Sequence, residues 1–146
     1  MDWGYAKPFS VGWWAVVADD YQTDGPKLPR GCLVRYREWY GAVGPNVGAR
    51  LDAEDVAKGI KEREAGEKID AAVLDPSAFA QNGGPSIAER MASSHKVMFR
   101  PADNTRAGQR GAMSGWDAMR GRLVGDDDGN PMMVFFSTCA DAIRTI

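Results

Sequence analysis

The sequence contains few of the residues on which several kinds of site depend. It has only two cysteines and one histidine in 146 residues. Cys32 and Cys139 have neither the CxxC spacing of a zinc site nor the density of a disulfide-stabilised protein. We therefore expect both to be buried free thiols. There is no GxSxG sequence around Ser77, so Ser77 and His95 do not indicate a serine hydrolase.

Long apolar runs are also missing. The longest surrounds Val11–Ala18, far short of the ~20 residues that a membrane-spanning helix needs, and no signal-peptide pattern begins at Met1. We expect a protein that neither crosses a membrane nor is secreted. Hydrophobic residues make up 44% and charged residues 26% of the chain, as in ordinary globular proteins, and 146 residues suffice for one domain.

An excess of positive charge is missing too. The chain has 18 Lys and Arg against 20 Asp and Glu, a formal net charge of −2, which does not by itself indicate a nucleic-acid-binding protein. The charges are unevenly spread, however. Bases predominate from His95 to Leu123 and acids from Leu51 to Asp75, which predicts one basic and one acidic surface.

The first third of the chain has the pattern of two strands. Phe9–Val17 is aromatic and β-branched, and Gly31–Tyr40 alternates between two faces. Turn-forming residues fill Asp19–Arg30 between them, which predicts a hairpin with a variable tip. The glycine-rich segment Gly41–Ala49 is predicted to be a loop.

Helices and strands then alternate. Asp52 is a good N-cap for an amphipathic helix that ends at Gly66, and Ser86 with Glu89 forms a capping box. Further elements are expected in this order: strand Ile69–Leu74, helix Ser86–Met91, strand Lys96–Arg100, helix Gly108–Val124, turn Asp126–Pro131, strand Met132–Ser137 and helix Ala140–Ile146. We expect the Gly108–Val124 helix to pack on the sheet through Ala112, Trp116, Met119 and Leu123.

Two aspartates fall where strands of such a sheet would end. Asp2 precedes Gly4 on the expected first, central strand, and Asp75 follows Leu74 on a strand expected to run parallel beside it. Carboxylates from neighbouring strand ends can share hard cations, and phosphodiester cleavage uses two Mg²⁺ or Mn²⁺ ions roughly 4 Å apart. The alternative is that Asp2 is a plain terminal residue and Asp75 a turn former before Pro76.

Six segments, taken in order, resemble the nuclease domain of the large terminase subunit of tailed phages and prophages: MDWG, YREWYGA, LDAEDVAKGI, AAVLDPSAF, FRPADNTRAGQ and MMVFFSTCADAIRTI. The resemblance runs over nearly the whole chain. It implies a single α/β domain over residues 1–146 with an RNase H-like mixed sheet. In that fold antiparallel hairpin strands come first, parallel strands with crossover helices follow, and the layers are α/β/α. The order of elements expected above is the same.

The resemblance also assigns catalytic and metal-ligating residues. Asp2 matches the first catalytic aspartate of the family and Asp75 the second, and both would hold the two-metal Mg²⁺ or Mn²⁺ site. The third carboxylate of the family lies on a helix beyond the last residue here, and Asp141 is the only late candidate. The ATPase domain that precedes this domain in the family is absent, since no GxxxxGKS/T sequence occurs. We therefore expect a fragment truncated at both ends.

The DNA contacts implied are less specific. Arg106 and Arg110 lie four positions apart at the start of a helix, where they can bind DNA phosphates or simply form a solvated face. Asn104 belongs to a segment that lies near the active site in the family. The implied activity is endonucleolytic cleavage of concatemeric viral DNA. The implied partners are double-stranded DNA, the terminase ATPase domain, the small terminase subunit and the portal protein, in the cytoplasm of a bacterial host.

Two other functions fit parts of this pattern. A catalytically incomplete domain that binds DNA, or docks on the packaging motor without cutting, is favoured by the missing third carboxylate. An actin-like sugar kinase or chaperone half also begins with a DxG strand and a hairpin. That architecture needs a second similar domain, for which 146 residues leave no room.

Overall fold

The computed structural model describes residues 1–104 and 115–146. It is a mixed α/β structure in which antiparallel and parallel strands combine with helices, which confirms the expected fold class at that level. The chain divides into two compact units. Unit 1 is Met1–Val11 with Tyr40–Asp103, and unit 2 is Gly12–Trp39 with Asn104–Ile146. Two long strands, β1 (Phe9–Val16) and β4 (Leu33–Gly44), contribute residues to both units and are described unit by unit.

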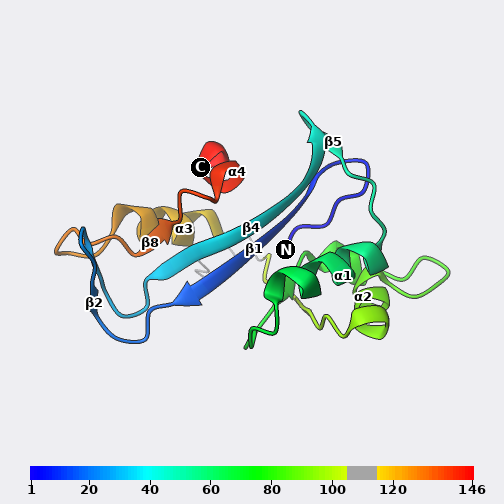
Figure 1. The fold of residues 1–146 in the computed structure, drawn as a ribbon, viewed down its shortest axis with the longest axis horizontal. Coiled ribbons are helices and arrows are strands. Elements are labelled where there is room, and N and C mark those ends of the chain that lie inside the picture. Colours follow the sequence, from blue (N-terminus) through cyan, green and yellow to red (C-terminus); the bar gives the residue numbers. More distant parts are fainter. Residues whose placement is uncertain (105–114) are drawn as a thin grey trace. The chain divides into compact units, whose positions relative to one another are not determined.

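The strands β1 and β4 are hydrogen-bonded neighbours. Within unit 1 the Phe9 ring lies against Gly41. Within unit 2 the Val17 N–H donates to the Cys32 carbonyl at 3.0 Å. Residue 9 of β1 thus lies beside residue 41 of β4, and residue 17 beside residue 32. The two strands therefore run antiparallel (Figure 1). The expected hairpin is confirmed.

In unit 1, β4 continues past the expected strand end and turns back into β5 (Val47–Gly48). The prediction that Gly41–Ala49 is a loop was therefore wrong. Asn46 takes the positive φ of 57° that the turn requires, as asparagine tolerates better than most residues. Glycines at 41 and 48 allow the Phe9 ring and the Tyr5 carbonyl to approach, so they serve close packing inside a strand.

Two short parallel strands complete the sheet of unit 1. In β6 (Val73–Leu74) and β7 (Arg100–Pro101), Val73 pairs with Arg100 and Leu74 with Pro101. The expected strands Ile69–Leu74 and Lys96–Arg100 are thus present but shorter and shifted. The Arg100 and Ala102 N–H groups donate to the Ala72 and Leu74 carbonyls at 3.0 and 2.9 Å, so Pro101, which has no N–H, does not interrupt this ladder.

The first two residues join these strands to β1. The Asp2 N–H donates to the Ser10 carbonyl at 2.9 Å and the Ser10 N–H to the Asp2 carbonyl at 3.0 Å, an antiparallel bridge. On the other side, the Met1 nitrogen donates to the Val73 carbonyl at 2.8 Å and the Asp75 N–H to the Met1 carbonyl at 3.2 Å, a parallel pattern. The strand order in unit 1 is therefore β7, β6, Met1–Asp2, β1, β4, β5.

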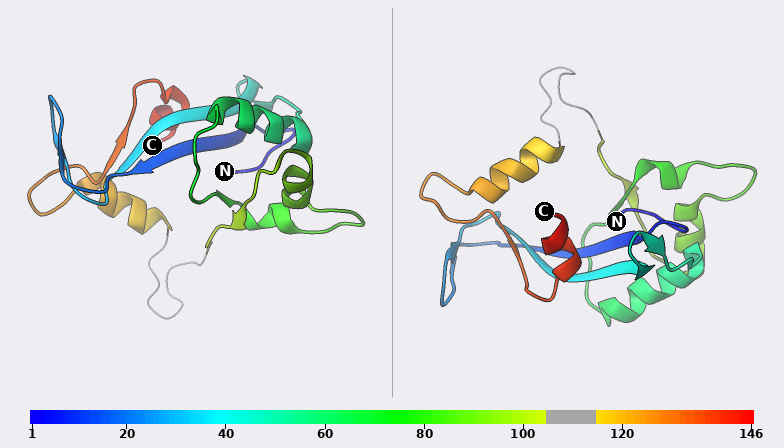
Figure 2. Two further views of the ribbon diagram at one scale, coloured as in Figure 1. Left: turned by 60° about the horizontal axis from the view of Figure 1, so that its bottom comes forward. Right: turned by 90° about the horizontal axis from the view of Figure 1, so that it is seen from above.

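Two helices pack together in unit 1 (Figure 2). Helix α1 (Ala53–Glu64) begins at Asp52, whose side chain accepts the Asp55 N–H at 2.9 Å, as expected. Helix α2 (Ile87–His95) begins at the expected capping box of Ser86 and Glu89 but extends beyond Met91.

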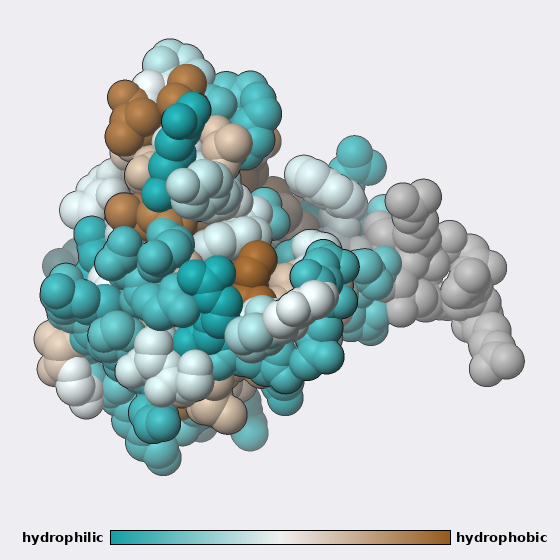
Figure 3. Space-filling model, turned by 90° about the vertical axis from the view of Figure 1, so that its right-hand side faces the viewer, coloured by the Kyte–Doolittle hydropathy of each residue, from teal (hydrophilic) through white to brown (hydrophobic). Residues whose placement is uncertain are grey.

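The face of the molecule turned to the viewer in Figure 3 is mostly hydrophilic, with hydrophobic residues in separate small groups.

Helix α2 and the 3₁₀ helix that follows β6 pack on one face of the unit 1 sheet. Leu74 packs with Ala78, from the 3₁₀ helix η1 (Pro76–Phe79), and with Ala88 of α2. Partly buried hydrophobic residues complete this cluster: Met1, Trp3, Phe79, Ile87 and Phe99. Successive residues of a strand point to opposite faces of the sheet. The residues that follow Met1, Leu74 and Phe99 on their strands therefore point to the face opposite this cluster.

Unit 2 is built around β4. Strand β8 (Met133–Phe135) pairs with it in parallel, Leu33 beside Met133 and Arg35 beside Phe135. The tip of the hairpin forms a small antiparallel ribbon of β2 (Tyr21–Gln22) and β3 (Lys27–Leu28). Cys32 and Cys139 are both fully buried and free, which confirms the sequence prediction, and burial raises the pKa of each thiol.

Helix α4 (Ala140–Thr145) is held by a side chain of β4. Glu38 accepts the Asp141 N–H at 2.8 Å and the Ala142 N–H at 3.0 Å. The N-cap residue, Cys139, makes no side-chain capping bond, so Glu38 takes over the capping role. Arg35 pairs with Glu38 at 3.5 Å, and the side chains of both are largely buried, 14% and 8% exposed.

Helix α3 (Gly115–Val124) departs from the sequence prediction. Trp116 is 71% and Leu123 43% exposed, and none of its residues is buried. The expectation that Trp116 and Leu123 pack on the sheet was wrong, whereas Met119 is partly buried and α3 contacts β8. Ala112 lies outside the described residues. An apolar stripe predicts which side of a helix favours burial. It does not predict which surface of the protein that side packs against. None of the helices in the described part of the chain is long and apolar enough to cross a bilayer.

The packing of Gly41 supports a stability prediction. A Cβ at this position would lie 2.1 Å from the nearest Phe9 ring carbon, and Phe9 is only 1% exposed. We expect Gly41→Ala to lower the free energy of unfolding by about 1–3 kcal/mol through overpacking. Gly44→Ala, in the same strand but with open space around the added methyl group, is the control. Equal urea-unfolding midpoints for the two variants would contradict the close packing of Phe9 on Gly41.

Candidate functional site

The structure brings Asp2 and Asp75 side by side. The two hydrogen bonds of Met1 place it opposite Leu74, so the next residues along these parallel strands, Asp2 and Asp75, are neighbours. Adjacent strands lie about 4.8 Å apart, and residues paired across them direct their side chains to the same face. The sequence prediction that these two strands run parallel is thus met in unit 1.

Both carboxylates lie on the face of the sheet opposite the core. Met1 and Leu74, one position earlier on each strand, point into the hydrophobic cluster with α2. Asp2 is exposed and Asp75 is partly buried. Ser10, which bridges to Asp2, lies on this face too, whereas its neighbours Phe9 and Val11 are buried. This side of unit 1 therefore carries the polar residues Asp2, Asp75 and Ser10.

Asp75 has a defined local geometry at the end of β6. It is the N-cap of η1, and its Oδ1 accepts the Ser77 N–H at 2.8 Å and also the Ser77 hydroxyl. The turn-forming role considered for this Asp-Pro pair is therefore real. It occupies one carboxylate oxygen, and within residues 1–104 and 115–146 no hydrogen bond to Oδ2 is found. Oδ2 remains available to a cation.

The Ser77 hydroxyl and N–H lower the pKa of Asp75, the hydroxyl having the larger effect. A depressed pKa keeps the carboxylate ionised, and able to bind a cation, down to a lower pH than usual. The associated stability is present above the unfolded-state pKa and is lost as the pH falls through the lowered native value.

Removing the hydroxyl tests this arrangement. We expect Ser77→Ala to raise the pKa of Asp75 toward its ordinary value, but only in part, since the backbone donor remains. The measurement is an NMR titration of the Asp75 carboxyl carbon. Ser93→Ala, which removes an exposed hydroxyl bonded to the Arg90 carbonyl, is the matched control. An unchanged Asp75 titration in Ser77→Ala would contradict the role given to the hydroxyl.

The described residues supply two acidic ligands at this place rather than a full set. Among residues 1–104 and 115–146, no group of three or more His, Cys, Asp or Glu side chains is placed to hold a metal ion. Carboxylate oxygens nevertheless suit Mg²⁺ and Mn²⁺, and Mg²⁺ usually keeps several water ligands when one or two carboxylates bind it. Asp2 and Asp75 fit such a site in their chemistry and their shared face.

The remaining predicted site residues lie elsewhere. Asp141 is in α4 of unit 2, where it pairs with Arg144 at 3.2 Å. Asn104 is exposed in unit 2. Arg106 and Arg110 lie outside the described residues.

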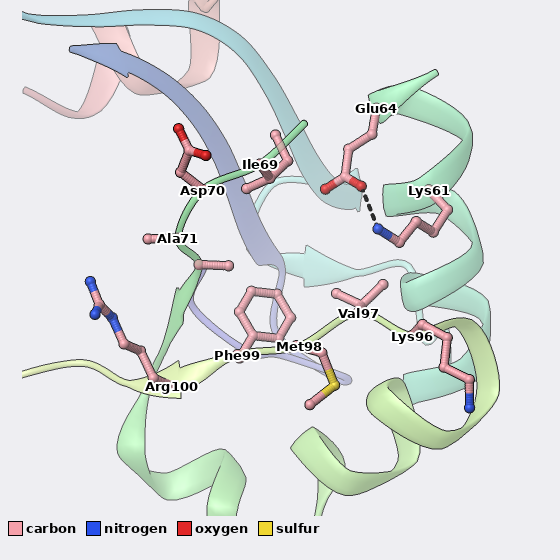
Figure 4. A pocket seen from close by; sticks show the side chains of 11 residues that line it. Lys61, Glu64, Ile69, Asp70, Ala71, Lys96, Val97, Met98, Phe99 and Arg100 are labelled. Carbon is pink, nitrogen blue, oxygen red and sulfur yellow. Dashed lines mark hydrogen bonds and ion pairs between the residues drawn. The ribbon is translucent and has the colours of Figure 1, made fainter. Parts of the chain in front are cut away.

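A separate cleft of about 450 Å³ opens at the amino ends of β6 and β7 (Figure 4). Val97, Phe99 and Ile69 form its apolar part, and Lys61 donates to Glu64 at 2.8 Å across its rim. Neither Asp2 nor Asp75 lines this cleft, whereas Arg100 lies at its edge.

Comparison with known proteins gives no match to a family model, to a curated protein or to a solved structure.

One residue on the aspartate face was missed by sequence reasoning. Arg100 was assigned to a strand but not to the site, because its position relative to Asp75 depends on the register between β6 and β7. Alternation along the strand predicts that Arg100 and Phe99 point to opposite faces. It does not predict that Arg100 and Asp75 share a face, because that depends on the register between two strands distant in sequence.

Proposed function

We propose that this chain is a Mg²⁺- or Mn²⁺-dependent DNA endonuclease domain with an RNase H-like fold, of the kind found in the large terminase subunit of tailed phages. The observation that carries the proposal is the placement of Asp2 and Asp75 on one polar face of two adjacent parallel strands in unit 1. Carboxylates at such strand ends hold the divalent ions of two-metal phosphodiester hydrolysis.

The strand order of unit 1 supports the fold part of the proposal. The terminase likeness implies antiparallel hairpin strands followed by parallel ones. In unit 1 the Met1–Asp2 segment has the antiparallel strand β1 on one side and the parallel strands β6 and β7 on the other. The central position of the Met1–Asp2 segment agrees with the position expected for the strand with the first catalytic aspartate.

The roles of the chain's own residues follow from their placement. Asp2 and Asp75 would hold the metal, which supplies an activated water and charge stabilisation on the leaving oxygen when bound. Ser77 lowers the pKa of Asp75 and holds its Oδ1, which leaves Oδ2 for a cation. The polar face gives a phosphodiester access to both carboxylates.

The proposal extends to the biological setting implied by the terminase likeness. The substrate is concatemeric viral DNA, and the partners are the terminase ATPase domain, the small subunit and the portal protein in the bacterial cytoplasm. A second candidate, a catalytically incomplete DNA-binding or motor-docking domain, is favoured by one observation. The described residues bring together two carboxylates rather than three.

Nicking of supercoiled plasmid separates the two candidates. The purified chain, shown to be folded by circular dichroism, is incubated with Mn²⁺, Mg²⁺ or EDTA. We expect open-circular product with either metal and none with EDTA. Metal-independent background cutting, or no cutting by the folded chain, would contradict the nuclease proposal and favour the incomplete domain.

A further inference from the structure

We propose that Arg100 binds a backbone phosphate of DNA beside the Asp2–Asp75 pair. This inference rests on the proposed function, since it assumes that the face with the two aspartates receives DNA. It adds a positioning residue to that face, which neither the sequence pattern nor the terminase likeness assigned.

The register of β6 and β7 places Arg100 on the aspartate face. Arg100 pairs with Val73 in parallel, and paired residues share a face. Val73 lies two positions before Asp75 on the same strand, so it points the same way as Asp75. Accordingly Val73 is 43% exposed, while Leu74 and Phe99, the next positions on each strand, belong to the core cluster.

In Figure 4 Arg100 lines the edge of the cleft, and its side chain points away from the Phe99 ring. Strand spacing gives the separation from Asp75. One strand step of about 4.8 Å and two residues of about 3.3 Å each put the two backbones roughly 8 Å apart. A phosphate between them is within reach of both side chains, since that of Arg is long.

Arg100 is also available. It is exposed, and within residues 1–104 and 115–146 its guanidinium makes no hydrogen bond or ion pair, while its backbone N–H donates to the Ala72 carbonyl. Other arginines are engaged, Arg90 with Glu54 and Arg122 with the Gly31 carbonyl. A guanidinium presents several N–H donors in a planar fork that matches phosphate oxygens.

The Arg100 guanidinium offsets the negative charge of the aspartate face. Two carboxylates repel a phosphodiester, so without added attraction DNA would approach the site poorly. Arg100 supplies attraction that does not depend on metal and places it to one side of the carboxylates. The phosphate it binds would hold the duplex in position over Asp2 and Asp75.

Binding of a fluorescent duplex, followed by anisotropy in EDTA, tests the inference without cleavage. We expect Arg100→Ala to weaken binding roughly tenfold and to reduce the slope of log K against log salt by about 1. Arg100→Lys should retain the slope and part of the affinity. Lys68→Ala, which removes an equal charge from a 91% exposed side chain of unit 1, is the control and should change affinity much less.

The outcomes for the inference and for the nuclease proposal are separable. If Arg100→Ala and Lys68→Ala weaken binding equally, or if the salt slope is unchanged in Arg100→Ala, the inference is overturned even where the wild-type chain nicks plasmid. If the wild-type chain binds DNA through Arg100 but does not cut, the inference stands and the nuclease proposal fails. No detectable binding of the wild-type chain overturns the inference. Circular dichroism of each variant confirms that it is folded.

Discussion

Replacing Asp75 by asparagine is expected to reduce metal-dependent nicking by at least about 100-fold, because even residues that only support a metal ligand change metal affinity or activity 10–100-fold. Asparagine has the same shape and keeps an Oδ1 that can accept the Ser77 N–H, so η1 should still form. What is lost is the negative charge and the second carboxylate oxygen. Asp2→Asn is expected to have an effect of similar size.

The control for this result is an aspartate that lies away from the site. Asp70→Asn removes one acidic charge from an 85% exposed side chain of unit 1 and should leave the nicking rate unchanged. Initial rates on supercoiled plasmid are compared at a fixed Mn²⁺ concentration. An Asp75→Asn variant that is folded and cuts at the wild-type rate would exclude Asp75 as a metal ligand.

The largest effect on stability is expected at Glu38. Its carboxylate accepts two N–H groups of α4 and pairs with Arg35, whose Nε is buried and makes no hydrogen bond within the described residues. Glu38→Ala leaves the Arg35 charge and both helix donors without their acceptor. Breaking a buried pair in this way costs about 3–5 kcal/mol in the free energy of unfolding.

Urea unfolding followed by tryptophan fluorescence measures this cost. Glu62→Ala is the matched control, since Glu62 is 63% exposed and faces Lys58 at 4.0 Å. Such an exposed pair contributes about 0–1 kcal/mol. Glu38→Gln, which keeps an acceptor but not the charge, should fall between the two. A Glu38→Ala midpoint equal to that of Glu62→Ala would show that α4 does not depend on this cap.

Local signals predicted the parts of the fold that depend on local interactions. Asp52 and the Ser86–Glu89 capping box identified the starts of α1 and α2, because the capping atoms lie within one helical turn. The β1–β4 hairpin and the burial of Cys32 and Cys139 followed from alternation and composition.

Features that depend on long-range packing were not predicted. The extension of β4 into β5 was hidden by glycines that look like loop residues but admit the Phe9 ring and the Tyr5 carbonyl. The Glu38 cap on α4 joins positions more than 100 residues apart. The exposure of Trp116 depends on which surface, if any, receives the apolar stripe of α3.

The candidate site was predicted in part for the same reason. Asp2 and Asp75 could be chosen as strand-end aspartates, and they are neighbours in unit 1. Ser77 as a partner of Asp75 required the geometry of η1, and Arg100 required the register of β7. Asn104 is exposed in unit 2, and Arg106 and Arg110 fall outside the described residues.

The most direct test of the central claim, that Asp2 and Asp75 together bind a divalent cation, is a Mn²⁺ titration followed by the paramagnetic resonance signal of the free ion. The wild-type chain, Asp2→Asn, Asp75→Asn and the double variant are compared near neutral pH. We predict that each substitution weakens Mn²⁺ binding and that the double variant loses less than the sum of the two, as expected for ligands of one site. Equal Mn²⁺ affinity in the wild-type chain and the double variant would contradict the claim.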